Sequence, residues 1–169
     1  FSYTFVRSEF TDKNDEYVPS SWDSRHVLSL TGGKRWDSGW QIGFKFGLTG
    51  GLPYTPYDVD RSSRKNIWNV RGMGVRAYDR LNEKRLDPYH FLDVRIDKKW
   101  FFDRFSLNLY LDVQNVYGNA ADEPPILTVE RGPDGQALEQ VDDPTRYQTK
   151  FIDGSSSTVL PTLGVILEY

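Results

Sequence analysis

Apolar and polar residues alternate along two stretches of the chain with almost no interruption. In residues 104–117 one set of alternate positions is apolar or aromatic: Phe105, Leu107, Leu109, Leu111, Val113 and Tyr117. The positions between them carry Ser106, Asn108, Tyr110, Asp112 and Gln114. Residues 40–49 repeat the pattern. Because successive side chains of a strand point to opposite faces, this period of two predicts strands with one apolar and one polar face.

Four further stretches bring the predicted number of strands to six. Residues 90–102 alternate in the same way, with Lys98 on the apolar face, and residues 158–169 end the chain on a similar pattern. Weaker alternation marks residues 1–9 and 25–36. The polar faces carry charges that we expect to share one side of the sheet: Lys45, Asp93, Arg95, Asp97, Lys99 and Asp112.

The connections between these strands alternate between long and short. Residues 35–39 and 102–104 are tight turns, whereas residues of about 10–24, 50–89 and 118–157 form long loops. Barrels of the bacterial outer membrane have short periplasmic turns and long extracellular loops. Strands of about 13 residues that rise about 3.3 Å per residue and tilt near 45° also project to about 30 Å, the thickness of a bilayer core.

The sequence therefore predicts an all-β fold, namely a segment of an antiparallel up-and-down transmembrane β-barrel whose C-terminus lies on the periplasmic side. Within the third long loop, residues 132–135 (GPDG) separate two short extended runs and predict a hairpin. A soluble β-sandwich or a lipocalin-like barrel, with the apolar face turned inward, is the alternative that alternation alone leaves open.

Aromatic side chains stand where a membrane boundary would favour them. Trp36, Trp40, Trp100 and Phe102 lie at the short-turn ends of the strands, and amphipathic rings favour the membrane interface. These four residues predict an interface girdle, and Lys98 is close enough to that end to extend its ammonium toward it.

Composition narrows the function classes. No run of about 18 apolar residues exists, which excludes a helical membrane protein. A net charge of −3 argues against a nucleic-acid binder, and the absence of Cys excludes disulfides and thiolate metal sites. Aromatic residues make up 15% of the chain although the mean hydropathy is −0.60, as expected for interleaved strands. The first ten residues lack the pattern of a signal peptide, so we expect a mature or truncated protein.

The last eight residues, TLGVILEY, carry a motif. Thr162, Gly164, Leu167 and Tyr169 occupy the polar, glycine, hydrophobic and terminal aromatic positions of a pattern similar to the β-signal that the barrel-assembly machinery recognises. An unpaired edge strand offers its backbone groups to such a machine before it pairs within its own barrel. The motif predicts that residues 158–169 form a closing strand.

Several stretches resemble the closing third of TonB-dependent receptors, in the branch that imports glycans, peptides and siderophores. They are residues 17–30 (YVPSSWDSRHVLSL), 47–57 (GLTGGLPYTPY), 85–100 (RLDPYHFLDVRIDKKW), 109–118 (LYLDVQNVYG) and 160–169 (LPTLGVILEY). The resemblance implies a barrel of 22 strands around an N-terminal plug, with uptake driven through TonB. It also implies the partners: the rest of the barrel and its plug, TonB through the N-terminal part, the barrel-assembly machinery, outer-membrane lipid and a surface lipoprotein.

Six strands are too few for a closed barrel, because the smallest known barrels have eight. We therefore expect the remaining strands to come from elsewhere in the protein or from another chain. The main functional hypothesis is TonB-dependent uptake of a scarce ligand. Its rivals are a structural or adhesive outer-membrane barrel and a soluble β-sheet carbohydrate-binding module.

Candidate chemistry in the loops is limited. Tyr54, Tyr57, Trp68 and Tyr78 could stack on sugar rings or aromatic ligands, and could equally pack loop against loop. The acidic loop of residues 118–157 lacks the spacing of a calcium-binding loop, and His26 and His90 stand alone, so no metal or cofactor is expected. Charges of alternating sign on one strand face are more typical of cross-strand pairing or of plug contacts than of acid–base catalysis, so we expect no enzyme.

Overall fold

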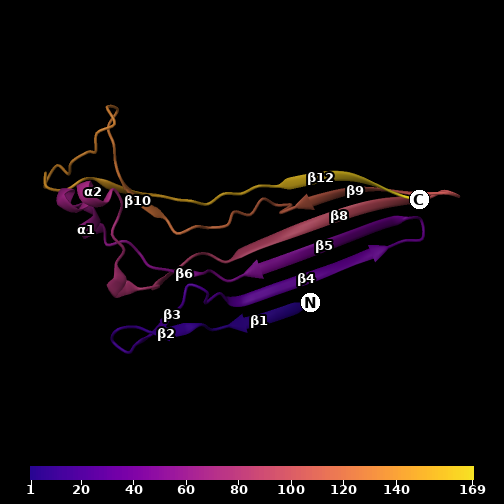
Figure 1. The fold of residues 1–169 in the computed structure, drawn as a ribbon, viewed down its shortest axis with the longest axis horizontal. Helices are drawn as coiled ribbons and strands as arrows, with labels where there is room; N and C mark the ends of the chain where they lie inside the picture. The colour runs from indigo at the N-terminus through magenta and orange to yellow at the C-terminus, as the bar shows by residue number, and fades with distance from the viewer.

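The computed structural model describes residues 1–169, and six strands form one antiparallel sheet. The sheet contains β1 (Ser2–Val6), β4 (Arg25–Arg35), β5 (Trp40–Thr49), β8 (Tyr89–Phe101), β9 (Ser106–Gln114) and β12 (Leu160–Glu168). Their order in the sheet is their order along the chain, so the sheet is an up-and-down meander. Figure 1 shows the strands side by side, with the short turns at one end and the long connections at the other.

The six predicted strands are confirmed, with small differences in their bounds. β5 covers residues 40–49 as predicted, whereas β1 ends at Val6 and a separate short strand, β2 (Glu9–Thr11), follows it. The register keeps the two faces apart, because Ile96 pairs with Ile42 on one side and Leu111 on the other. The fold is therefore all-β, with one apolar and one polar face to the sheet.

The two short connections are tight because backbone hydrogen bonds close each turn. The Trp36 N–H donates to the Trp40 carbonyl at 2.9 Å, and the Phe102 N–H donates to the Phe105 carbonyl at 2.9 Å. Gly39 has a φ of +84°, a conformation that L side chains rarely adopt, and a Cβ there would fall on the Lys99 carbonyl.

The sheet is open, and β1 and β12 are its two edges. β12, the predicted closing strand, pairs with β9 along its whole length, from Leu160 opposite Gln114 to Glu168 opposite Ser106. Within this chain β12 has no second neighbour.

The long connections contain short elements that gather at one end of the sheet (Figure 1). They are β2, β3 (Tyr17–Pro19), β6 (Pro53–Tyr54), α1 (Val59–Ser63), α2 (Lys65–Arg71), the 3-10 helix η1 (Tyr78–Arg80), β7 (Lys84–Arg85), β10 (Ile126–Val129) and β11 (Thr149–Ile152). The predicted hairpin at 132–135 is present: the Gly132 N–H donates to the Gln136 carbonyl at 2.9 Å, and Gly135 has a φ of +79°.

The two helices were not predicted from the sequence. The Asp58 side chain accepts the Arg61 N–H at 2.9 Å and caps the start of α1, and Gly72, whose φ is +66°, caps the end of α2. Capping residues of this kind mark where a helix begins and ends. Helices of five and seven residues, however, have too few turns to show a helical period in the sequence. None of the helices has the length and apolar content needed to cross a membrane.

The buried apolar residues lie among the long connections and not on the sheet. They are Trp68, Val75, Ala77, Leu127 and Val129. Large apolar side chains of the sheet remain partly or largely exposed, including Leu111 at 43% and Leu163 at 71%. The sheet therefore has an apolar face that nothing in this chain covers.

Candidate functional site

The polar face of the sheet carries the six predicted charged residues together. Cross-strand partners include Lys45 with Asp93 and Arg95 with Asp112. Arg95 donates to both oxygens of Asp97 at 3.0 and 2.9 Å, and its guanidinium lies 3.9 Å from the ring centroid of Tyr110. Lys99 pairs with Glu168 two strands away. Part of the polar face is therefore a network of ion pairs that fixes its side chains.

A hollow of about 520 Å³ lies on the polar face near the long connections. We call it the polar-face hollow, and its lining includes Lys45, Phe91, Asp93, Gln114, Asn119 and Thr158. A smaller hollow of about 200 Å³ shares Lys45, Asp93 and Gln114 and extends along the same face toward Asp112. The sequence pattern places Lys45 and Asp93 on one face but does not predict a hollow, because the far wall of the hollow comes from residues 156–160 near β12.

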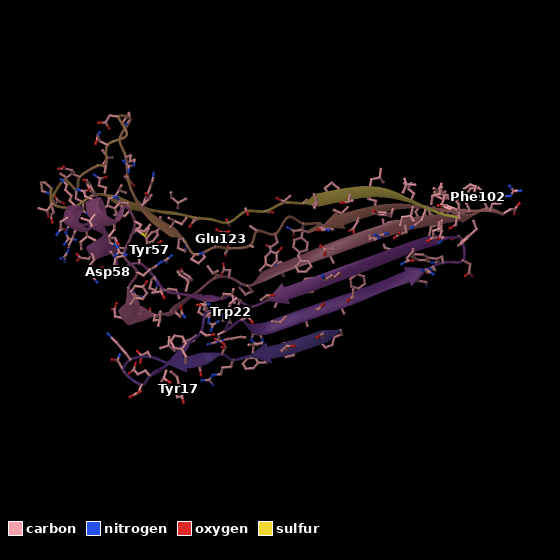
Figure 2. All side chains as sticks on the ribbon, in the orientation of Figure 1. Tyr17, Trp22, Tyr57, Asp58, Phe102 and Glu123 are labelled. Atoms are coloured by element: carbon pink, nitrogen blue, oxygen red, sulfur yellow. The ribbon has the colours of Figure 1, made fainter.

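The predicted girdle residues lie together at the short-turn end of the apolar face. Trp36, Trp40, Trp100 and Phe102 are all between 39% and 52% exposed, and Phe102 is at the far end of the sheet in Figure 2. The Lys98 ammonium extends to this end, where it donates to the Ser38 carbonyl at 2.6 Å. It also lies 5.2 Å from the Trp40 ring centroid. The predicted orientation of Lys98 is confirmed.

A second belt of polar-tipped rings lies at the opposite end of the apolar face. The Tyr3 hydroxyl and His26 Nδ1 are 2.9 Å apart, and the Tyr117 hydroxyl and His90 Nδ1 are 2.7 Å apart. In the sequence the two histidines stand alone, because their tyrosine partners are 23 and 27 residues away. Their position at the ends of two strands on the apolar face was the signal that could have identified them.

The four motif residues at the C-terminus occupy different surroundings. Leu167 lies opposite Leu107 on the apolar face, and Thr162 and Gly164 lie on the polar face opposite Asp112 and Tyr110. Tyr169 follows β12 and its side chain is fully exposed. The motif therefore combines residues that pack within the sheet with one that packs against nothing in this chain.

The second and third long connections, residues 50–89 and 118–157, interlock, and we call them the loop assembly. The Lys65 N–H donates to the Thr145 carbonyl at 3.0 Å and the Tyr147 N–H donates to the Ser63 carbonyl at 2.7 Å. Arg146 donates to the Asp60 carboxylate at 2.6 Å. Hydrogen bonds from Arg146 and then from Arg64 hold the pKa of Asp60 below its usual range. These contacts join two segments that are about 80 residues apart in the chain.

The four aromatic candidates in the loops fall into two groups. Trp68 is buried in the loop assembly, and Tyr57 is packed between Arg76, 3.8 Å from its ring centroid, and Phe151, 6.4 Å away. Tyr78 is 72% exposed, and Tyr54 lines a groove of about 360 Å³. Tyr54 and Tyr57 also line a neighbouring groove of about 350 Å³, so Trp68 is the one of the four whose burial keeps it from a ligand. Figure 2 shows Tyr57 beside Asp58, at the base of the helices.

Asp23 joins the first long connection to the second. Its carboxylate accepts the Ser8 N–H at 3.0 Å and pairs with Arg85, and the side chain is almost fully buried. Arg85 also donates to the Asp23 and Gly51 carbonyls at 2.6 and 2.9 Å. Burial raises the pKa of Asp23, but the Ser8 hydrogen bond and Arg85 outweigh burial and hold the pKa below its usual value. The sequence does not predict this pair, because Asp23 and Arg85 are 62 residues apart.

No cluster of three or more His, Cys, Asp or Glu side chains has the geometry to hold a metal ion. No protein family, no curated protein and no solved structure matches this chain.

Proposed function

We propose that this chain forms part of the wall of an outer-membrane β-barrel that imports a scarce ligand in a TonB-dependent manner. The observation that carries the proposal is the exposed apolar face of the sheet, bounded at both ends by polar-tipped aromatic side chains. In water, contiguous exposed apolar patches rarely exceed a few hundred Å². Lipid is a solvent in which such a face is stable.

The distance between the two belts fits a bilayer. On β8 the girdle includes Trp100 and the second belt includes His90, a span of about ten residues that rises about 33 Å along the strand. With a tilt near 45° this projects to about 23 Å, close to the apolar band of about 25 Å on outer-membrane barrels. The match supports a membrane-spanning sheet over a soluble sandwich.

The open edges support membership in a larger barrel. Unpaired N–H and C=O groups in lipid cost several kcal/mol each, so an open sheet of six strands is not a stable end state there. We infer that β1 and β12 pair with further strands to close a barrel of about 22 strands, as the resemblance to TonB-dependent receptors implies. The polar face then lines the lumen, where a plug would sit.

The orientation follows from the connections. In our proposal the short turns and Tyr169 are periplasmic, and the loop assembly is extracellular, where it meets ligand or a surface lipoprotein. Extracellular loops that interlock through a small core, as these do around Trp68 and Leu127, present a fixed surface to a ligand.

Site-specific labelling in intact cells tests the membrane reading. The 169 residues contain no Cys, so each single substitution introduces the one thiol of this segment, and the unsubstituted protein gives the background labelling. We choose Val141→Cys in the loop assembly, where Val141 is 89% exposed, and Asp37→Cys in a short turn as the matched control. A maleimide too large to cross the outer membrane should label residue 141 in intact cells and residue 37 only after permeabilisation. Equal labelling of both residues, or recovery of the protein in the soluble fraction, would contradict the proposal.

A second experiment separates an importer from a structural or adhesive barrel. In-cell crosslinking should join the complete protein to TonB, because an importer must receive energy through it. A protein that resides in the outer membrane, yet gives no crosslink to TonB under conditions where a known receptor does, supports the adhesive or structural class instead.

A further inference from the structure

Two opposite charges in the polar-face hollow face each other without pairing. Lys45 and Asp93 are cross-strand partners in the β5–β8 register, yet no ion pair joins them. The Lys45 ammonium instead lies 5.3 Å from the centroid of the Phe91 ring and has no hydrogen-bond acceptor in the chain. One oxygen of Asp93 accepts the Asn115 N–H at 2.9 Å, and its other oxygen is free. An unpaired hydrogen-bond donor on β5 and an unpaired acceptor on β8 therefore both border the hollow.

This arrangement contrasts with the ion-pair network on the same face. Arg95, Asp97, Lys99 and Glu168 satisfy one another through ion pairs. Polar groups in the hollow are left open: the Gln114 side chain makes no hydrogen bond, and Asn119 uses its amide nitrogen on the His90 carbonyl while its oxygen stays free. The hollow therefore gathers several hydrogen-bonding groups of the polar face that have no partner within the chain.

Aromatic side chains form part of the same hollow. The Phe91 ring lies across Gly47, where a Cβ would be 2.5 Å from the ring, so Gly47 gives the ring room to lie close to the backbone. The Tyr89 ring is next to it, with centroids 5.9 Å apart. Both residues line the hollow, so it offers an apolar surface beside its polar groups.

We propose that the polar-face hollow binds one ring of a carbohydrate, which packs against Phe91 and Tyr89. A sugar ring has apolar C–H patches that suit an aromatic surface, and hydroxyls that both donate and accept hydrogen bonds. Its hydroxyls would donate to Asp93 and accept from Lys45 and Gln114, which satisfies groups that are open in the chain. The inference rests on the proposed function, because it takes the polar face to line a lumen through which a ligand passes.

The rival occupant is a zwitterion such as a short peptide, which could pair its termini with Lys45 and Asp93. The aromatic pair and the uncharged Gln114, Asn119 and Thr158 favour the sugar, because two charged termini leave these groups without partners. The two classes give different results in the following experiment.

The test is saturation-transfer NMR on the complete protein in detergent micelles. The probes are a mixture of glucose, galactose, mannose, xylose, fucose and N-acetylglucosamine, and separately alanyl-alanine. At least one sugar should receive saturation on its ring protons. In the Phe91→Ala variant its affinity should fall about threefold to tenfold, because the sugar loses the aromatic surface against which it packs.

Phe101→Ala is the matched control, because Phe101 lies on the same strand and the same face at the opposite end of the sheet. It should bind sugar as the unmodified protein does. Lys45→Gln provides a second variant that keeps the side chains of Gly47 and Phe91 unchanged, and it should also weaken binding. If no sugar receives saturation, if Phe91→Ala and Lys45→Gln bind normally, or if alanyl-alanine alone responds, the inference is wrong.

The labelling experiment distinguishes a failure of the carbohydrate site from a failure of the proposed function. A protein that shows the predicted membrane topology and crosslinks to TonB but binds no sugar would refute the carbohydrate site alone. A protein that fails the topology test would refute the membrane proposal whatever it binds.

Discussion

Gly164 on β12 lies directly opposite Tyr110 on β9, and the Tyr110 ring occupies the space that a Cβ at residue 164 would fill. The same relationship joins Gly47 to Phe91 and Gly32 to Phe44. Rings that cover glycines in this way compensate for the missing side chain in the sheet. Gly164 therefore has a packing role within the sheet in addition to any role in the C-terminal motif.

We predict that Gly164→Ala destabilises the pairing of β9 with β12. The added methyl group overlaps the Tyr110 ring, and overpacking of this kind costs about 1–3 kcal/mol. Urea unfolding of the complete protein in detergent measures the change. Gly43→Ala is the control, because a Cβ there meets only the Gly32 carbonyl oxygen, at 3.9 Å.

The double variant Gly164→Ala with Tyr110→Ser separates packing from recognition. If packing is the role of Gly164, the double variant should recover stability and assembly relative to Gly164→Ala. If the barrel-assembly machinery reads the glycine itself, assembly in cells should stay impaired although stability recovers.

We predict that Tyr169→Asp reduces insertion into the outer membrane but leaves the folded protein stable. Its side chain is fully exposed, so the substitution breaks no contact in the chain. The amount of heat-modifiable protein in outer-membrane fractions measures insertion, and refolding into detergent measures intrinsic stability. Tyr78→Asp, at another exposed tyrosine, should leave insertion unchanged. Normal insertion of the Tyr169→Asp variant would remove the support for an assembly motif.

We predict that Leu127→Ala loosens the loop assembly without opening the sheet. Leu127 is only 2% exposed, and truncation of a buried leucine costs about 2–5 kcal/mol. Hydrogen exchange should rise in residues 50–89 and 118–157 and stay slow in β5 and β8. Ile126→Ala, at a neighbour that is 53% exposed, is the matched control and should change little. Exchange that rises equally in the sheet would show that loops and sheet unfold as one unit.

We predict that the contact between the first and second long connections weakens in acid because of Asp23. The folded pKa of Asp23 is below the value of about 3.9 that an unfolded chain has. The contact therefore contributes its full stability above about pH 4 and loses it as the pH falls through the lower, folded pKa. Hydrogen exchange in residues 8–24, corrected for intrinsic rates, should increase between pH 6 and pH 3.

Two variants control this pH experiment. Asp23→Asn should raise exchange at pH 6 and remove most of its dependence on pH. Asp15→Asn, at an exposed carboxylate in the same connection, should keep the response of the unmodified protein. If the Asp23→Asn variant keeps the pH response, the response arises from another titrating group.

The strands and their faces were predictable because they depend on local geometry. The positions of Ile42 and Lys45 on opposite faces follow from a period of two, and residues 40–49 gave β5 its bounds. The short turns were predictable for the same reason, since Trp36 and Gly39 lie within a few residues of the partners that close the turn. The motif residues were found as a pattern, but the partner of Gly164 was not.

The sequence by itself thus determined a sheet with two chemically different faces, a group of aromatic residues at its short-turn end and the order of its connections. Only the tertiary structure decided that Trp68 and Leu127 share a core, that Asp23 meets Arg85, and that Lys45 and Asp93 border a hollow instead of pairing. The reason is physical. The pleat of a strand makes neighbouring side chains point to opposite faces, so alternation can be recognised from adjacent residues alone. The contacts named above join residues tens of positions apart, and they depend on which connections the sheet brings to the same end.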